Sequence, residues 1–139
     1  MILDELATYL ASTGVGYTTV GGTTGDIFKA LAPQSPNSAL MLFEYPGLPS
    51  YKTMQGGVGG AIAELPRVQI VCRGIPQDYN TPRTNAKAVH NKLDGLGQKT
   101  MTGIEYLWIE ALSPPFLLER DENERVWIAC NYQVTKRSS

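Results

Sequence analysis

The residues best able to do chemistry are the single histidine, His90, and the two cysteines, Cys72 and Cys130. A cysteine nucleophile needs a nearby base, so a small hydrolase that pairs either thiol with His90 is one hypothesis for this chain. Against it, each cysteine occupies an apolar position of a predicted strand, and His90 lies on the margin of a predicted helix. Two distant cysteines in a reducing compartment are expected to be buried small side chains rather than a disulfide.

Metal, phosphate and carboxylate chemistry is not predicted either. A zinc site needs about four Cys or His ligands at suitable spacing, which one histidine and two separated cysteines do not supply. The glycine-rich run at 56–60 lacks the Lys-Ser or Lys-Thr pair that completes a phosphate loop. Asp121, Glu122 and Glu124 lie together at a predicted turn, where solvated carboxylates are expected. The sequence therefore predicts no catalytic residue, no metal and no cofactor.

The overall charge argues against a nucleic-acid partner. Twelve Lys and Arg against 13 Asp and Glu give a formal net charge of −1, so no general positive field attracts a phosphate backbone. Specific nucleic-acid binding is not predicted. A single-strand binder that stacks bases on Trp108 and Trp127 is an alternative, and salt-sensitive oligonucleotide binding would reveal it.

Length and hydropathy predict one domain made in the cytoplasm. The 139 residues fit a single domain over 1–139. Asp4 and Glu5 stand where a secretory signal would carry basic residues, and glycines interrupt the charge-free stretch 6–25, so no membrane segment is expected. Only 18% of residues are charged, below the usual quarter or so. Such a surface is typical of a protein that packs against others, with an ordinary neutral domain as the alternative.

Hydrophobic periodicity predicts two helices and several strands. Helical spacing indicates one helix over 2–10 and a second that starts at Pro82 and ends at Gly95 or Gly97. The strands, read from alternation and β-favouring residues, are expected at 27–31, 39–45, 66–73 and 104–112, followed by a C-terminal hairpin at about 116–135. This order predicts an α+β fold, with a mainly antiparallel five- or six-stranded sheet and two helices packed on one face.

The stretch at about 46–65 is predicted to be a long loop. It contains Pro46, Pro49 and five glycines and shows no regular pattern. Consecutive glycines lose much conformational entropy when ordered, which suits a mobile loop that becomes ordered on docking.

Several stretches together resemble the tail terminator, or minor capsid, proteins of long-tailed bacteriophages. They are Leu3–Leu10, Phe43–Pro49, Pro66–Ile70, and a C-terminal pattern of strand, acidic turn, Arg and strand in Pro115–Arg125 and Asn131–Val134. The likeness covers nearly the whole chain in order, although no single motif is diagnostic.

The resemblance implies a virion assembly protein without enzymatic activity. Such a protein forms a ring, expected to be hexameric, on the last ring of the major tail tube protein and stops tube growth. It then offers a surface to the head-tail connector protein. Assembly in the host cytoplasm and a final place in the tail or neck of the virion follow. A head-completion or neck protein is the nearest alternative.

An assembly role also suggests which residues contact neighbours. Exposed aromatic residues and methionine are enriched in interfaces, and arginine forms forked contacts with carboxylates. The predicted interface residues in the long loop and at its start are Tyr45, Leu48, Tyr51 and Met54. The polar candidates are Arg73, Arg120 and Asp121.

Overall fold

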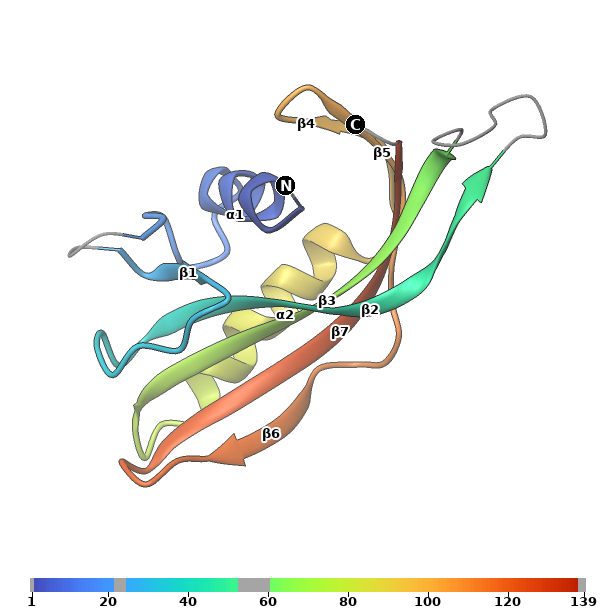
Figure 1. The fold of residues 1–139 in the computed structure, drawn as a ribbon. Coiled ribbons are helices and arrows are strands. Elements are labelled where there is room, and N and C mark those ends of the chain that lie inside the picture. The colour runs from blue at the N-terminus through green and yellow to red at the C-terminus, as the bar shows by residue number, and fades with distance from the viewer. Residues whose placement is uncertain (1, 22–24, 53–60, 138–139) are drawn as a thin grey trace.

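The computed structural model describes residues 2–21, 25–52 and 61–137 (Figure 1). In chain order, the elements are α1 (Ile2–Ser12), β1 (Ile27–Lys29), β2 (Ala39–Lys52), β3 (Ala61–Pro76), α2 (Asn80–Leu93), β4 (Leu96–Met101), β5 (Ile104–Ala111), β6 (Phe116–Arg120) and β7 (Arg125–Arg137). No helix within the described ranges is long and apolar enough to cross a membrane.

The strands form one mixed sheet in the order β1-β2-β3-β7-β5-β4, with β6 paired to β7. β1 runs parallel to β2, and the other pairs are antiparallel. The predicted α+β class is confirmed. The predicted strand number is too low, since the described residues form seven strands. β4 was missed because its residues are mostly exposed and polar and show no apolar alternation.

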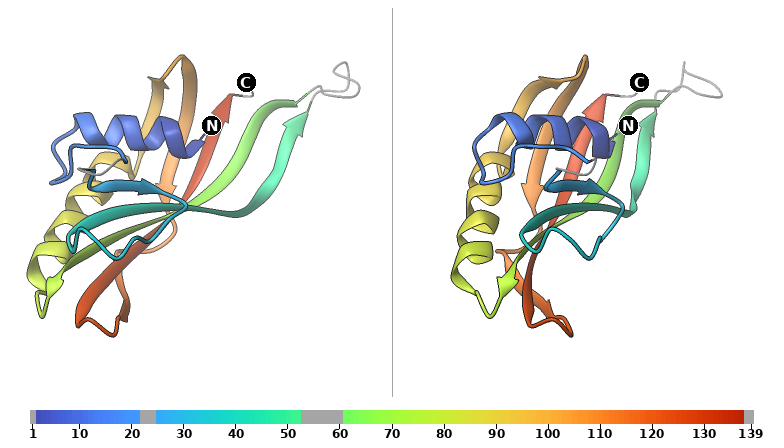
Figure 2. Two further views of the ribbon diagram at one scale, coloured as in Figure 1. Left: turned by 60° about the vertical axis from the view of Figure 1, so that its left-hand side comes forward. Right: turned by 90° about the vertical axis from the view of Figure 1, so that its left-hand side faces the viewer.

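Both helices pack on one face of the sheet, as Figure 2 shows. The apolar stripe of α1 includes Leu6 and Leu10, and that of α2 includes Val89 and Leu93. They meet the inward residues of β7, where Val126, Ile128, Cys130, Tyr132 and Val134 alternate as buried positions. Burial of these side chains stabilises the fold by roughly 1.5–3 kcal/mol each. The predicted helices, and the predicted alternation of β7, are confirmed.

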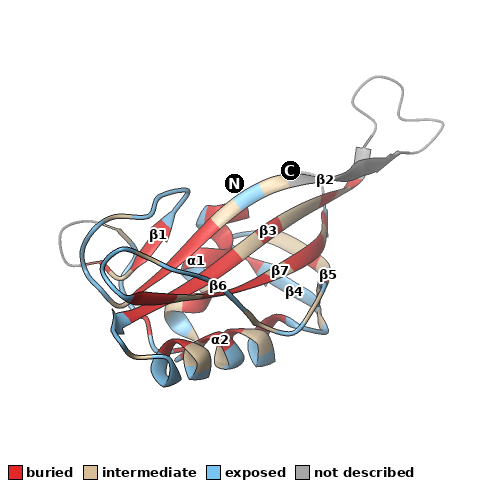
Figure 3. Ribbon diagram, turned by 90° about the horizontal axis from the view of Figure 1, so that it is seen from below, coloured by how far each residue is buried: buried red, intermediate tan, exposed pale blue. Residues whose placement is uncertain are grey.

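The opposite face carries a smaller apolar cluster. Phe28, Met41 and Val71 are buried there, and Phe43 and Trp127 are half-buried against them. Figure 3 shows buried residues running along the middle of the sheet, with exposed residues on the outer side of α2. No helix of the described residues packs on this face, which we call the helix-free face.

The predicted loop at 46–65 is wrong for the residues that the structure describes. Residues 46–52 continue β2 and residues 61–65 begin β3, with Leu48 paired to Leu65 and Tyr51 to Ala63. The register shifts after Tyr45 and again after Leu48. Such shifts let a strand accept Pro46 and Pro49, which interrupt regular pairing. The paired segments lie at one end of the sheet, where Ala63 and Glu64 of β3 also pair with Arg137 and Lys136 of β7 (Figure 1). We call residues 46–52 and 61–65 the arm. Residues 53–60 lie outside the described part.

The predicted C-terminal hairpin is confirmed as β6 and β7. Its turn places Glu124 at φ +62°, in the left-handed region where a glycine is commoner. β7 continues to Arg137 and lies in the centre of the sheet between β3 and β5. The last strand in the chain is therefore a core strand of the fold.

Candidate assembly surfaces

Cys72 is a buried core residue, as the sequence predicted. Its side chain is 1% exposed, and burial raises the pKa of its thiol to about 12. At neutral pH the thiol is protonated, so Cys72 is not a nucleophile.

Cys130 and His90 are closer together than the sequence suggested. The Cys130 Sγ lies 4.0 Å from His90 Nδ1. However, Cys130 is 2% exposed, its thiol donates a hydrogen bond to the Ser113 carbonyl at 3.1 Å, and burial raises its pKa. The His90 ring is also 3.7 Å from an Asp94 carboxylate oxygen. The pair lacks the exposed, activated thiol that a hydrolase needs.

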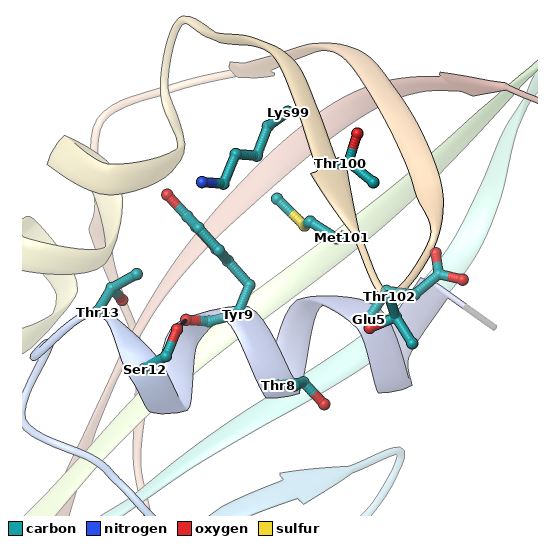
Figure 4. Close-up of a pocket in the computed structure, with 9 residues that line it drawn as sticks. All are labelled: Glu5, Thr8, Tyr9, Ser12, Thr13, Lys99, Thr100, Met101 and Thr102. Carbon is teal, nitrogen blue, oxygen red and sulfur yellow. Dashed lines mark hydrogen bonds between the residues drawn. The ribbon is translucent and has the colours of Figure 1, made fainter.

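A shallow hollow lies between α1 and β4 (Figure 4). Tyr9 and Lys99 point toward each other across it, with the Lys99 ammonium 5.8 Å from the ring centroid. The other lining residues are Glu5, Thr8, Ser12, Thr13, Thr100, Met101 and Thr102. Hydroxyls and one ammonium bind polar groups, but this lining contains no nucleophile paired with a base. Among the described residues, no group of His, Cys, Asp and Glu is placed to hold a metal.

Glu5 forms a buried polar cluster that joins the two ends of the chain. Its Oε1 accepts hydrogen bonds from the Tyr106 hydroxyl at 2.5 Å and from Lys136 Nζ at 3.0 Å. Glu5 is 5% exposed and Lys136 3%. Burial alone would raise the pKa of Glu5, but the bonds from Tyr106 and Lys136 outweigh it and the pKa is lowered. The cluster fixes α1 to β5 and β7.

A second polar cluster surrounds Trp127 and unites two of the predicted interface residues. The Arg73 guanidinium lies 5.6 Å from the Trp127 ring centroid. Asp121 Oδ2 accepts bonds from Trp127 Nε1 at 3.0 Å and from Arg125 Nε at 2.8 Å. Arg73 and Arg125 also donate to the carbonyls of Pro36 and Gln34. The cluster therefore pins segment 30–38 to the sheet.

Two of the three polar interface candidates are buried rather than exposed. Arg73 is 1% exposed, and Asp121, expected to be a solvated acid, is largely buried and bonded within the chain. Their polar atoms already have partners, so any effect on assembly would pass through segment 30–38 and the β6–β7 turn. Arg120 is exposed and pairs with Glu124 at 3.4 Å. A direct role of these three residues in an interface stays a prediction.

Tyr45 lies at a hollow on the helix-free face. The hollow is lined by Phe43, Glu44, Tyr45, Gln69 and Asn131. The Tyr45 hydroxyl and the Asn131 Oδ1 are shielded from solvent and make no hydrogen bond within the described residues. A buried polar atom without a partner costs stability.

Replacing Tyr45 with Phe is expected to leave the free energy of unfolding unchanged or to raise it by up to about 1 kcal/mol. The reason is that the buried hydroxyl has lost its hydrogen bonds to water and makes none to the described residues. Chemical denaturation of both proteins measures this difference. A loss of stability above that size would show that the hydroxyl has a partner within the chain. Reduced self-association with unchanged stability would place that partner in another subunit.

The remaining predicted contacts lie in the arm. Leu48 and Tyr51 are both strand residues of β2, and Met54 lies outside the described residues. Their roles as contacts stay predictions. Sequence reasoning missed Glu5, Lys136 and Arg125, because no local signal shows that a charged residue on a helix or strand faces inward.

The fold of the chain is similar to that of a solved structure. A chain in the virion of a native gene transfer agent (GTA) particle matches with a TM-score of 0.60 and 12% sequence identity, covering 96% of this chain and 94% of that chain. At this identity the match shows a shared fold. No curated protein matches the chain.

The family of the chain is shown by its sequence. Residues 9–137 match the family of bacteriophage tail terminator proteins, which is nearly the whole chain, so the protein belongs to that family. The resemblance seen in the sequence is thereby confirmed at the family level. Proteins of this family are structural parts of the phage tail.

Proposed function

We propose that the protein caps the phage tail tube as a hexameric ring, stops its polymerisation and forms the joint between head and tail. In this proposal it is made in the host cytoplasm and ends in the virion, in contact with the major tail tube protein and the head-tail connector. The match to the tail terminator family over residues 9–137 carries the proposal.

The structure supports such a role with three features. The sheet is held on one side by two packed helices, which gives a rigid body. The arm, formed by the ends of β2 and β3, lies at one end of the sheet (Figure 1). The two strands of the arm pair with irregular register, and the β3 side is also paired to β7 at Ala63 and Glu64. A neighbour that packs on the arm would stabilise it further. The helix-free face has a hollow, lined by Phe43, Tyr45 and Asn131 among others, that a second partner could fill.

Tube assembly in the presence of the protein tests the proposal. Purified protein is expected to form a concentration-dependent oligomer by size exclusion with light scattering, and to bind tubes of the major tail protein at an end. Added to growing tubes, it is expected to limit their length, as measured by electron microscopy. Tubes that grow without limit beside a protein that stays monomeric would refute the terminator role.

Deletion of the gene distinguishes the terminator from a head-completion or neck protein. Loss of a terminator is expected to leave overlong tails that do not join heads. Loss of a neck protein would instead leave tails of normal length beside unjoined, DNA-filled heads.

A further inference from the structure

α2 carries an unbalanced positive charge on its exposed side. Between Asn80 and Leu93 it contains Arg83, Lys87 and Lys92 and no Asp or Glu. Within the described residues, none of these three side chains forms an ion pair. By contrast, most of the described basic side chains on strands form ion pairs with carboxylates.

Arg83 and Lys87 line a groove beside the connection between β5 and β6. The groove is about 410 Å³ in volume and is lined by Arg83, Thr84, Lys87, His90, Pro114 and Pro115. We call it the basic groove. Arg83 is held in place because its Nη1 donates to the Pro115 carbonyl at 2.6 Å, which leaves its other guanidinium nitrogens available to a carboxylate. Asp94 also lies near this groove, and its carboxylate oxygen is 3.7 Å from the His90 ring.

The same chain presents a rigid acidic turn between β6 and β7. Residues 119–124 contain Glu119, Asp121, Glu122 and Glu124. Asp121 holds the turn in shape by accepting bonds from the backbone of Asn123 and Arg125, each at 3.0 Å. Glu119 and Glu122 are exposed and have no ion-pair partner within the described residues. We call this segment the acidic turn.

We propose that the basic groove binds the acidic turn of a second copy of this chain. A ring built head to tail needs two different surfaces on each subunit that fit each other. The groove and the turn have opposite charge, and each is fixed by bonds within its own subunit, so little ordering entropy is lost when they meet. This inference names the contact of the self-association proposed above, and it rests on that proposal.

A peptide carboxylate suits the groove better than nucleic acid does. Affinity for a phosphate backbone grows with the number of basic side chains that contact it. Arg83 and Lys87 are too few for strong phosphate binding, whereas forked bonds from an arginine to a carboxylate are specific in geometry. An acidic protein segment is therefore the occupant that the groove favours.

Charge reversal on each side tests the contact. Lys87→Glu and Glu122→Lys change exposed residues, and each is expected to weaken self-association about tenfold per contact, because attraction is replaced by repulsion. The double variant, Lys87→Glu with Glu122→Lys, is expected to regain association, since the pair is restored with exchanged signs. Light scattering over a concentration series at about 50 mM and 500 mM salt measures these effects, which salt should diminish.

Lys92→Glu and Glu110→Lys are the matched controls. Both make the same changes of charge at exposed positions outside the groove and the turn, and they are expected to associate like wild type. The inference would be overturned if the single reversals associate as well as wild type, or if the double variant does not recover. Either result would leave the proposed ring intact. Lys87→Glu rings that form normally but no longer cap tubes would assign the groove to the tube protein and overturn it too. A wild-type protein that stays monomeric with and without tubes would instead refute the proposed function.

Discussion

Replacement of Lys136 by Met is expected to lower the free energy of unfolding by about 3 to 5 kcal/mol. The substitution removes the ammonium that bonds to Glu5 but keeps most of the side-chain volume. Glu5 is 5% exposed, so its carboxylate would remain buried with this counterion gone. Glu5 keeps its bond from the Tyr106 hydroxyl, but the loss of a buried positive charge beside it is the largest effect that we expect from a single substitution. Urea denaturation followed by tryptophan fluorescence measures it.

A double-mutant cycle separates the ion pair from the loss of packing. Glu5→Gln combined with Lys136→Met removes both charges, and the double variant is expected to be more stable than Lys136→Met alone. Lys92→Met, at an exposed position, is the control and should change stability by less than about 0.5 kcal/mol. If Lys136→Met behaves like this control, the Glu5 cluster does not stabilise the fold.

The same cluster predicts how stability depends on acid. The folded-state pKa of Glu5 is lowered from its ordinary value of 4.5. A group with a lowered folded pKa stabilises the protein above its unfolded pKa, and this contribution is lost as the pH falls through the folded value. The wild type should therefore lose stability below about pH 4.5, and part of that loss should be missing in Glu5→Gln.

Replacement of Asp121 by Ala is expected to lower the free energy of unfolding by roughly 3 kcal/mol. The carboxylate bonds to both Arg125 and Trp127, and Arg125 is 3% exposed and Arg73 1%. Without Asp121, two guanidinium groups stay buried near each other with less compensating charge, and burial together with the charge of Arg125 already lowers the pKa of Arg73. Segment 30–38 should also become less protected from amide hydrogen exchange, because Arg125 and Arg73 hold it in place.

Glu122→Ala is the matched control for this cluster. Glu122 follows Asp121 directly and is exposed, so its loss should change stability by less than about 0.5 kcal/mol. The pKa of Asp121 is lowered from 3.8 to about 2, since the bonds from Trp127 and Arg125 outweigh the effect of burial. Its contribution is present above about pH 3.8 and is lost toward pH 2. Equal stability of Asp121→Ala and Glu122→Ala would show that Asp121 is a solvated turn residue, as the sequence alone suggested.

The elements that the sequence predicted are those whose pattern is local. The helix at Ile2–Ser12 and the strand at Arg125–Arg137 repeat their apolar residues at the spacing of one helical face or one strand face. β4 and the parallel pairing of β1 carry no such pattern. β4 is placed by its pairing to β5, which follows it after two residues, but its own residues are too polar to indicate a strand. β1 is placed by three residues beside β2.

The structure of the arm also depends on pairing between strands rather than on local pattern. Proline and glycine between residues 46 and 65 are typical of loops. In the structure, β3 supplies a partner strand for residues 46–52, and pairing with irregular register overrides the local preference. Strand propensity depends strongly on such context, which explains why this prediction was wrong.

What the sequence determined was the family, the α+β class, the apolar faces and the absence of a general basic field, because each depends on residue types and short spacings. Only the tertiary structure decided which charges are buried. Glu5 and Lys136 are separated by almost the whole chain, and Asp121 and Arg73 by nearly fifty positions. Their side chains meet because strands distant in sequence pair in one sheet, and this pairing also leaves the basic groove and the acidic turn exposed on the same subunit.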